Sequence, residues 1–174
     1  MVREPSDWAR SRGVVPRWLA REYGGWLNEP AYRAARKLVL VEPFLGGAGA
    51  QLPLDYKIYV FGGRAEVVQL HAERGKKHRW TQFDRYWRPL SDDPIDAPPP
   101  KTLKAMLGAA EFLAGDRDFL RVDFYEVDDK LWFGEFCLYP GSGLDPFAGD
   151  GLDEWLGNSW SRAKSDSLGR KLAD

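Results

Sequence analysis

The stretch that decides the fold is FLRVDFYEVDDKLWFGEFCLYPGSG, which spans residues 119–143. Its two apolar-rich runs flank an Asp-Asp-Lys cluster at 128–130 that is typical of a tight turn, so the stretch predicts a β-hairpin. Because side chains alternate between the two faces of a strand, the apolar residues of each run should share one face. We expect this core face to hold Leu120, Val122, Phe124, Trp132, Phe136 and Leu138.

The opposite face of the predicted hairpin receives Arg121, Asp123, Glu135 and Cys137. Pairing of the two runs brings Asp123 close to Glu135, and like charges opposed on a sheet, with Cβ atoms roughly 5 Å apart, repel each other. Either water solvates both carboxylates or a cation lies between them. Mg²⁺ is usually held by one or two carboxylates together with substrate phosphates, and Arg121 adds a fixed positive charge suited to an anionic oxygen. The pattern alone leaves both a metal-binding pair and an ordinary solvated face open.

The composition is that of an ordinary globular protein of one domain. The chain has 174 residues, with 25 basic and 26 acidic side chains and a formal net charge of −1. This balance gives no reason to expect a nucleic-acid or membrane-surface partner. The single cysteine, Cys137, excludes an internal disulfide and makes the cytoplasm the expected location. The longest aliphatic run, residues 38–41, is far too short to span a membrane.

The segments around the hairpin predict an α+β domain with a mostly antiparallel sheet and flanking helices. The expected elements, in order, are a short helix at about 17–23, a second one beginning at 29–30, a buried strand at 37–44, a hairpin of strands 54–61 and 64–71, and an amphipathic helix at 101–114. We divide the chain into a peripheral helical segment (1–36), the α+β domain (37–158) and a polar C-terminal tail (159–174).

Three further stretches carry charge or glycine. Asp55 and Lys57 share one strand face and predict a surface ion pair worth under about 1 kcal/mol. Residues 71–84 are basic and aromatic, and we interpret them as a solvated or substrate-facing loop rather than a nucleic-acid patch. The glycine-rich residues 46–49 lack the lysine and serine or threonine of a phosphate-binding loop, which favours a flexible connection.

Five blocks of the sequence follow one another in a recognisable order: LVEPFL (40–45), DYKIYVFGG (55–63), RVDFY (121–125), FGEF (133–136) and PGSG (140–143). Together they resemble the ATP-grasp ligases, specifically the TupA-like branch of the teichuronopeptide biosynthesis type. The resemblance covers residues 28–158, and it implies the fold of the C-terminal, metal-bearing portion of an ATP-grasp enzyme.

The resemblance also implies an activity and its cofactors, ATP and Mg²⁺. ATP-grasp enzymes phosphorylate a carboxylate with ATP, and an amine then attacks the acyl phosphate. In the TupA-like branch the context is cell-envelope polysaccharide, with amino acids joined to uronic acid carboxylates. The implied partner is therefore a small-molecule or polysaccharide carboxylate substrate.

Matching motifs assign roles to six residues. Glu42 and the backbone after it, as far as Phe44, would meet the adenine edge. Lys57 would approach a phosphate or the acyl group, and Arg121 would stabilise charge on the transferred phosphoryl group or the tetrahedral centre. Asp123 and Glu135 would hold Mg²⁺ that bridges the ATP phosphates.

Two features depart from the family's pattern. Cys137 stands where many ATP-grasp enzymes have an asparagine two residues after the metal-binding glutamate, and a thiol is a poor Mg²⁺ ligand, which weighs against a second metal. Before Lys37 we find neither the N-terminal domain nor the lysine-bearing, glycine-rich flap that covers the ATP phosphates. Three possibilities therefore stay open. The chain could be a shortened enzyme, half of a two-chain enzyme, or a remnant that binds without catalysing, and its partner could be a second chain or further copies of itself.

Two other interpretations stay open. One is a non-catalytic binding module of ATP-grasp-like fold that uses Trp80, Trp87 and the basic loop to hold an acidic glycan or a partner protein. The other is a glycosidase with Asp123 and Glu135 as its carboxylate pair, because retaining enzymes place these groups roughly 5 Å apart.

Overall fold

The computed structural model describes residues 5–23, 26–46, 52–72, 79–145, 147 and 151–171. The chain divides into two units, residues 1–44 and residues 45–174, and each is described by itself. None of the helices in the described ranges is long and apolar enough to cross a membrane.

The first unit contains helix α1 (Pro5–Ala20) and the 3₁₀ helix η1 (Pro30–Ala34). The short helix predicted at 17–23 is thus the end of a longer one, and the helix predicted from 29–30 is confirmed. The buried strand predicted at 37–44 is wrong, because residues 36–44 have no regular secondary structure and Leu40 is 85 % exposed. A β-forming composition becomes a strand only when a neighbouring strand pairs with its backbone groups, and no described residue pairs with this segment.

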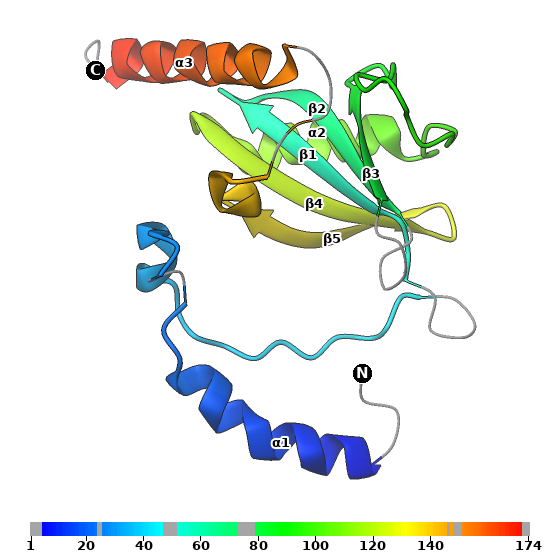
Figure 1. Cartoon of the computed structure of the whole chain (residues 1–174), viewed down its shortest axis with the longest axis vertical. Helices are drawn as coiled ribbons and strands as arrows, with labels where there is room; N and C mark the ends of the chain where they lie inside the picture. The colour runs from blue at the N-terminus through cyan, green and yellow to red at the C-terminus, as the bar shows by residue number, and fades with distance from the viewer. Residues whose placement is uncertain are drawn as a thin grey trace. The chain divides into compact units, whose positions relative to one another are not determined.

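The second unit is built on a five-stranded sheet in the order β3-β2-β1-β4-β5, in which all neighbours are antiparallel (Figure 1). The predicted α+β class and both predicted hairpins are confirmed. The elements are β1 (Asp55–Phe61), β2 (Arg64–Ala72), β3 (Arg79–Asp84), α2 (Leu103–Ala114), β4 (Phe119–Val127), β5 (Lys130–Cys137), η3 (Pro140–Gly143) and α3 (Leu152–Lys171).

Two elements differ from the sequence-based expectation. Residues 79–84, interpreted as part of a loop, form the edge strand β3, whose backbone pairs with β2 along its whole length. Residues 159–171 of the segment that we set apart as a polar tail belong to helix α3. There Ala163 is 5 % exposed and packs with Leu152 and Leu156 on the sheet.

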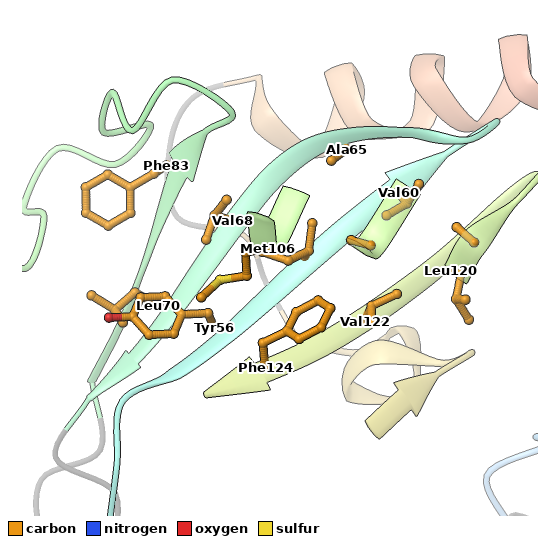
Figure 2. Close-up of a cluster of buried hydrophobic side chains, with 13 residues drawn as sticks. Tyr56, Val60, Ala65, Val68, Leu70, Phe83, Met106, Leu120, Val122 and Phe124 are labelled. Carbon is orange, nitrogen blue, oxygen red and sulfur yellow. The ribbon is translucent and has the colours of Figure 1, made fainter. Parts of the chain in front are cut away.

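The main core lies between α2 and one face of the sheet (Figures 1 and 2). Met106 and Ala110 of the predicted apolar stripe are fully buried against Ile58 and Val122. Each large aliphatic side chain buried in this way contributes about 1.5–3 kcal/mol. Glu126 fixes the start of α2, because its Oε2 accepts hydrogen bonds from Thr102 N at 2.7 Å and Thr102 Oγ1 at 2.6 Å. The opposite face of the sheet carries a second, smaller apolar cluster, in which Tyr59, Phe61 and Val67 pack with Leu152 and Leu156 of α3.

Gly63 in the β1–β2 turn should tolerate no side chain. Its φ is +82°, and a Cβ there would lie 2.7 Å from the Gly115 carbonyl oxygen. We expect Gly63→Ala to lower the free energy of unfolding by about 2–3 kcal/mol in urea denaturation. Gly108→Ala is the matched control: nothing lies within 4 Å of that Cβ, and the helix should gain about 0.5–1 kcal/mol. Equal effects at the two sites would contradict the description of the turn.

Candidate functional site

The polar face of the sheet is organised in rows that cross several strands. Lys57 on β1 is paired with Gln69 on β2 and with Asp123 on β4, and Asp123 is paired with Glu135 on β5. Directly opposed residues of an antiparallel sheet share a face. Gln69, Lys57, Asp123 and Glu135 therefore form one row, and the predicted pairing of Asp123 with Glu135 is confirmed.

The neighbouring row brings Arg121 and Cys137 onto the same face, as predicted, together with Tyr59. The prediction for Trp132 is wrong, because Trp132 pairs with Tyr125 on the polar face. The register shifts between Asp123 and Phe124, where Gly134 adds one residue to β5. A β-bulge of this kind inverts the alternation on one side of it.

Two other side chains also depart from the predicted alternation, Phe133 beside the bulge and Leu138 one residue past the end of β5. Phe133 takes the core-facing position, with its ring centroid 6.2 Å from that of Phe124. Leu138, also predicted for the core face, instead lines a cavity on the polar face. Gly134 leaves room for the bulge, because a Cβ at this position would lie 3.0 Å from the Asp123 carbonyl oxygen.

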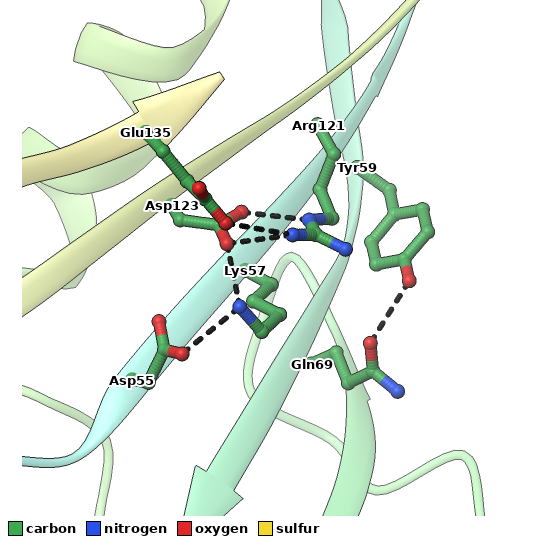
Figure 3. Close-up of polar contacts among 7 residues, drawn as sticks. All are labelled: Asp55, Lys57, Tyr59, Gln69, Arg121, Asp123 and Glu135. Carbon is green, nitrogen blue, oxygen red and sulfur yellow. Dashed lines mark hydrogen bonds and ion pairs between the residues drawn. The ribbon is translucent and has the colours of Figure 1, made fainter. Parts of the chain in front are cut away.

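Four side chains make a buried ion cluster in the centre of this face (Figure 3). Lys57 Nζ lies 2.9 Å from Asp55 Oδ2 and 2.5 Å from Asp123 Oδ2. Arg121 donates two hydrogen bonds to the Asp123 carboxylate, from Nε to Oδ1 at 2.7 Å and from Nη2 to Oδ2 at 2.8 Å. The side chains of all four are at most 10 % exposed. The prediction of a weak surface pair between Asp55 and Lys57 is therefore wrong, because both groups are buried.

Glu135 joins the cluster from its solvent side. Its Oε1 lies 3.4 Å from Arg121 Nη2, and its side chain is 64 % exposed. Burial and the charge of Asp123 raise the pKa of the Glu135 carboxyl group above its usual value, although Lys57 and Arg121 act in the opposite direction. Burial lowers the pKa of the Arg121 guanidinium, whereas the hydrogen bonds and the charge of Asp123 raise it. The net effect is a pKa above the usual value for arginine.

The cluster contains more acidic than basic groups. Its three acidic side chains, Asp55, Asp123 and Glu135, face two basic ones, Lys57 and Arg121, so the formal charges leave one negative charge over. No group of three or more His, Cys, Asp or Glu side chains among the described residues is placed to hold a metal alone. A Mg²⁺ ion bound by Asp123 and Glu135 would therefore need water or ligand oxygens to complete its shell, which is how Mg²⁺ is usually held.

A cavity of about 700 Å³ opens beside the cluster. The sheet forms one side of it, and η3 with the first half of α3 forms the other. Arg121 belongs to both the cavity wall and the ion cluster. The remaining wall mixes aromatic rings with polar groups, among them Tyr59, Gln69, His71, Trp80, Tyr139 and Trp160. Such a surface suits a ligand with both apolar faces and polar substituents.

The cavity mouth is shaped by the PGSG motif. Gly141, Ser142 and Gly143 all have positive φ, at 52°, 55° and 73°. A Cβ at Gly141 would overlap the carboxylate of Asp145. Glycine readily adopts a positive φ and has no Cβ that would overlap Asp145. The backbone conformation at the edge of the cavity therefore explains the glycines of the motif.

Tyr59 lies between the cluster and the cavity. Its hydroxyl donates a hydrogen bond of 2.9 Å to Gln69 Oε1. Burial raises the pKa of Tyr59 to about 12, although the neighbouring Arg121 acts to lower it. The phenol therefore stays protonated and acts as a hydrogen-bond donor at physiological pH.

The high pKa of Tyr59 predicts a loss of stability at alkaline pH. The folded-state pKa lies above the value near 10 of an unfolded chain, so the contribution is complete below pH 10 and is lost as pH rises toward 12. We expect Tyr59 to account for about 2–3 kcal/mol of this loss in urea denaturation. Tyr59→Phe should flatten the curve, whereas Tyr86→Phe, at a side chain 68 % exposed, should not. Identical curves for the two variants would contradict the prediction.

The structure brings four of the six predicted site residues together: Lys57, Arg121, Asp123 and Glu135. Glu42 and Phe44 belong to the first unit, so their proposed role at the adenine stays a prediction. Sequence reasoning missed Asp55, Tyr59 and Gln69 as parts of the site. Alternation along β1 puts Asp55 and Tyr59 on the same face as Lys57, but only the pairing of β1 with β4 shows what that face meets.

The aromatic residues proposed for glycan binding separate into two places. Trp80 lines the cavity and stacks on His71, with ring centroids 6.1 Å apart. Trp87 instead stacks on Phe83 of the core, at 4.1 Å, and donates a hydrogen bond to the Ala97 carbonyl oxygen, so its predicted role in ligand binding is wrong. The basic residues 74–78 lie outside the described residues, as do residues 47–49 of the glycine-rich loop.

Comparison with known proteins identifies the family. The family model described as TupA-like ATPgrasp matches residues 19–161, which is most of the chain. No curated protein and no solved structure matches it. The antiparallel sheet with flanking helices agrees with an ATP-grasp-like domain. The chain belongs to the TupA-like ATP-grasp family.

Proposed function

We propose that this chain is an ATP-dependent carboxylate–amine ligase, or the metal-bearing half of one, that acts in the modification of cell-envelope polysaccharide. The observation that carries the proposal is the convergence of Asp123 and Glu135 on the Arg121 guanidinium, at the edge of a 700 Å³ cavity. Membership of the TupA-like ATP-grasp family supports the use of ATP.

In such a ligase, Mg·ATP supplies the phosphoryl group that converts a carboxylate into an acyl phosphate, and the amine then displaces phosphate to form an amide. Asp123 and Glu135 would hold the ion on the phosphates. Phosphoryl transfer depends mainly on positioning and on neutralising charge. A permanent guanidinium charge at a fixed position, such as that of Arg121, meets this need without any proton transfer.

The cavity is the proposed site of the carboxylate substrate. Arg121 uses Nε and Nη2 for Asp123 and Glu135, while its remaining nitrogen, Nη1, projects toward Tyr59 (Figure 3). A carboxylate in the cavity would meet this nitrogen, and its ring or chain would rest on Trp80 and Trp160. The body of a sugar acid fits these surfaces.

An assay for the coupled reaction tests this proposal. The chain is incubated with Mg·ATP, a uronic-acid polysaccharide and an amino acid mixture, and ADP is measured together with hydroxamate formed when hydroxylamine replaces the amine. We expect ADP release that requires the polysaccharide and is lost in Glu135→Gln. A rate of ADP release that is the same with and without the polysaccharide would contradict the proposed ligase activity. If a second chain supplies a lysine-bearing flap, activity should appear when the protein that co-purifies with this chain is added.

The cavity also supports a second function, that of a non-catalytic binding module of ATP-grasp-like fold for an acidic glycan. The supporting observation is that aromatic side chains, including Trp80 and Trp160, line the cavity, whereas Asp123 and Glu135 are not among its lining residues. This function predicts glycan binding that is indifferent to Mg²⁺ and nucleotide. A glycosidase gains no support, because Asp123 is 1 % exposed and both its oxygens accept hydrogen bonds from cationic groups.

A further inference from the structure

Three neighbouring strands bring a line of polar groups to the cavity. Arg121 on β4 is paired with Tyr59 on β1, and Gln69 on β2 lies diagonally across from Tyr59. All three side chains line the cavity, and none is more than 8 % exposed. The Tyr59 ring packs against Phe119 and Phe147, with ring centroids 6.2 and 5.8 Å apart. This packing fixes the place of the Tyr59 hydroxyl beside its two polar neighbours (Figure 3).

Arg121 sets the direction of the hydrogen bonds along this line. A guanidinium can only donate, so a contact between Arg121 and Tyr59 uses a lone pair of the phenol oxygen. Such a hydrogen bond is among the effects that act to lower the pKa of Tyr59, but burial prevails and raises this pKa to about 12. The hydroxyl therefore keeps a proton that Arg121 cannot accept. That proton is donated to Gln69 Oε1 at 2.9 Å.

The Gln69 amide is thereby turned with its nitrogen away from Tyr59. Because Oε1 accepts the Tyr59 proton, Nε2 and its two hydrogens lie on the other side of the amide (Figure 3). Gln82 is paired with Gln69 across the sheet, but its Oε1 has no hydrogen-bond partner among the described residues and so does not accept from Nε2. No other residue in the described ranges accepts from Nε2 either. Since Gln69 lines the cavity, Nε2 is a donor for a ligand.

The charges of the cavity wall decide what kind of oxygen this donor receives. Among the described lining residues, Arg121 carries a permanent positive charge, whereas Asp145 and Asp153 are acidic. One ligand carboxylate can pair with Arg121, but a second anionic group would be repelled by the two aspartates. The neutral amide of Gln69 suits a neutral oxygen, such as a hydroxyl or a ring oxygen. A carboxylate that also carries neutral oxygens is a sugar acid.

We propose that Gln69 makes the cavity selective for sugar acids over plain carboxylates, by donating from Nε2 to a hydroxyl or ring oxygen of a ligand whose carboxylate is held at Arg121. Tyr59 is a positioning residue that keeps the amide turned toward the ligand. The inference rests on the proposed function in one respect, namely that the cavity takes the carboxylate substrate. It requires no metal ion and no nucleotide.

The test compares two six-membered rings with one carboxylate each, methyl glucuronide and cyclohexanecarboxylate, by calorimetric titration into the full chain. Both offer a carboxylate to Arg121, but only the sugar offers neutral oxygens to Gln69. Gln69→Met keeps the length of the side chain and removes the amide. It should weaken binding of the sugar by about three- to tenfold and change binding of cyclohexanecarboxylate by less than about twofold. The matched control Asn158→Met removes an amide at an exposed position of α3 that does not line the cavity, and it should change neither affinity.

A double-mutant cycle isolates the positioning role of Tyr59. Tyr59→Phe removes the proton that orients the amide, so it should reduce the preference for the sugar over cyclohexanecarboxylate by about two- to threefold. In the Gln69→Met background there is no amide left to orient, and the same substitution should leave the preference unchanged. An equal effect of Tyr59→Phe in both backgrounds would contradict the positioning role.

A measurement on the wild type removes any dependence on the folding of variants. In NMR spectra the side-chain amide protons of Gln69 should move to lower field as methyl glucuronide is added, but not as cyclohexanecarboxylate is added. Sugar binding without this shift, or sugar binding that Gln69→Met does not weaken, would overturn this inference and leave the carboxylate site intact. Failure of the wild type to bind either ligand would overturn that site as well, and with it the proposed place of the substrate.

Discussion

Asp123→Asn is expected to lower the free energy of unfolding by about 3–5 kcal/mol. The substitution keeps the shape of the side chain but removes the charge that Lys57 and Arg121 share, and both cationic side chains are at most 10 % exposed. A buried cation without its partner is far more costly than a broken surface pair. Urea denaturation followed by circular dichroism measures the loss.

Asp129→Asn is the matched control for this prediction. Asp129 Oδ2 lies 2.7 Å from Lys101 Nζ, a distance close to those in the cluster, but the two side chains are 62 % and 72 % exposed. Its φ of 58° is also a conformation that asparagine adopts readily. The control should change the free energy of unfolding by less than about 1 kcal/mol. A cost for Asp123→Asn no larger than that of the control would show that the cluster does not hold the sheet together.

Glu135→Gln is expected to separate function from stability. Its side chain is 64 % exposed and 3.4 Å from its nearest cationic partner, so the substitution should change the free energy of unfolding by no more than about 0.5 kcal/mol. It removes one of the two carboxylates proposed for Mg²⁺. Binding of a fluorescent ATP analogue in the presence of Mg²⁺ should therefore weaken by about tenfold or more.

The control for Glu135→Gln is Glu154→Gln, at an exposed position in the first turn of α3. It makes the same chemical change away from the cluster and should leave nucleotide binding at the wild-type level. Retention of Mg²⁺-dependent binding in Glu135→Gln would remove this side chain from the metal site. A large loss of stability in the same variant would instead give it a structural role.

The hairpin and its paired carboxylates are the part of the site that the sequence predicts best. Alternation along a strand and a turn at Asp128 and Asp129 are local properties, and they suffice to oppose Asp123 and Glu135. Local alternation failed at Trp132, where the bulge at Gly134 inverts it. A glycine within a strand pattern is the signal for such a bulge, and it was present in the sequence.

The parts that the sequence left undetermined depend on long-range pairing. Asp55 and Lys57 form a buried cluster instead of a surface pair because β4, some 66 residues after Lys57, brings Asp123 and Arg121 against them. The cavity is likewise shaped by η3 and α3, which follow the sheet in sequence. Strand order decides which polar faces become buried, and composition alone does not encode it.

Calorimetric titration of ATP into the full chain, with and without Mg²⁺, tests the central claim most directly. If Asp123 and Glu135 hold a cation on the phosphates, binding heat should appear with Mg²⁺ and disappear when the ion is removed by a chelator. Nucleotide binding of equal strength with and without the ion, or no heat under either condition, would contradict the claim.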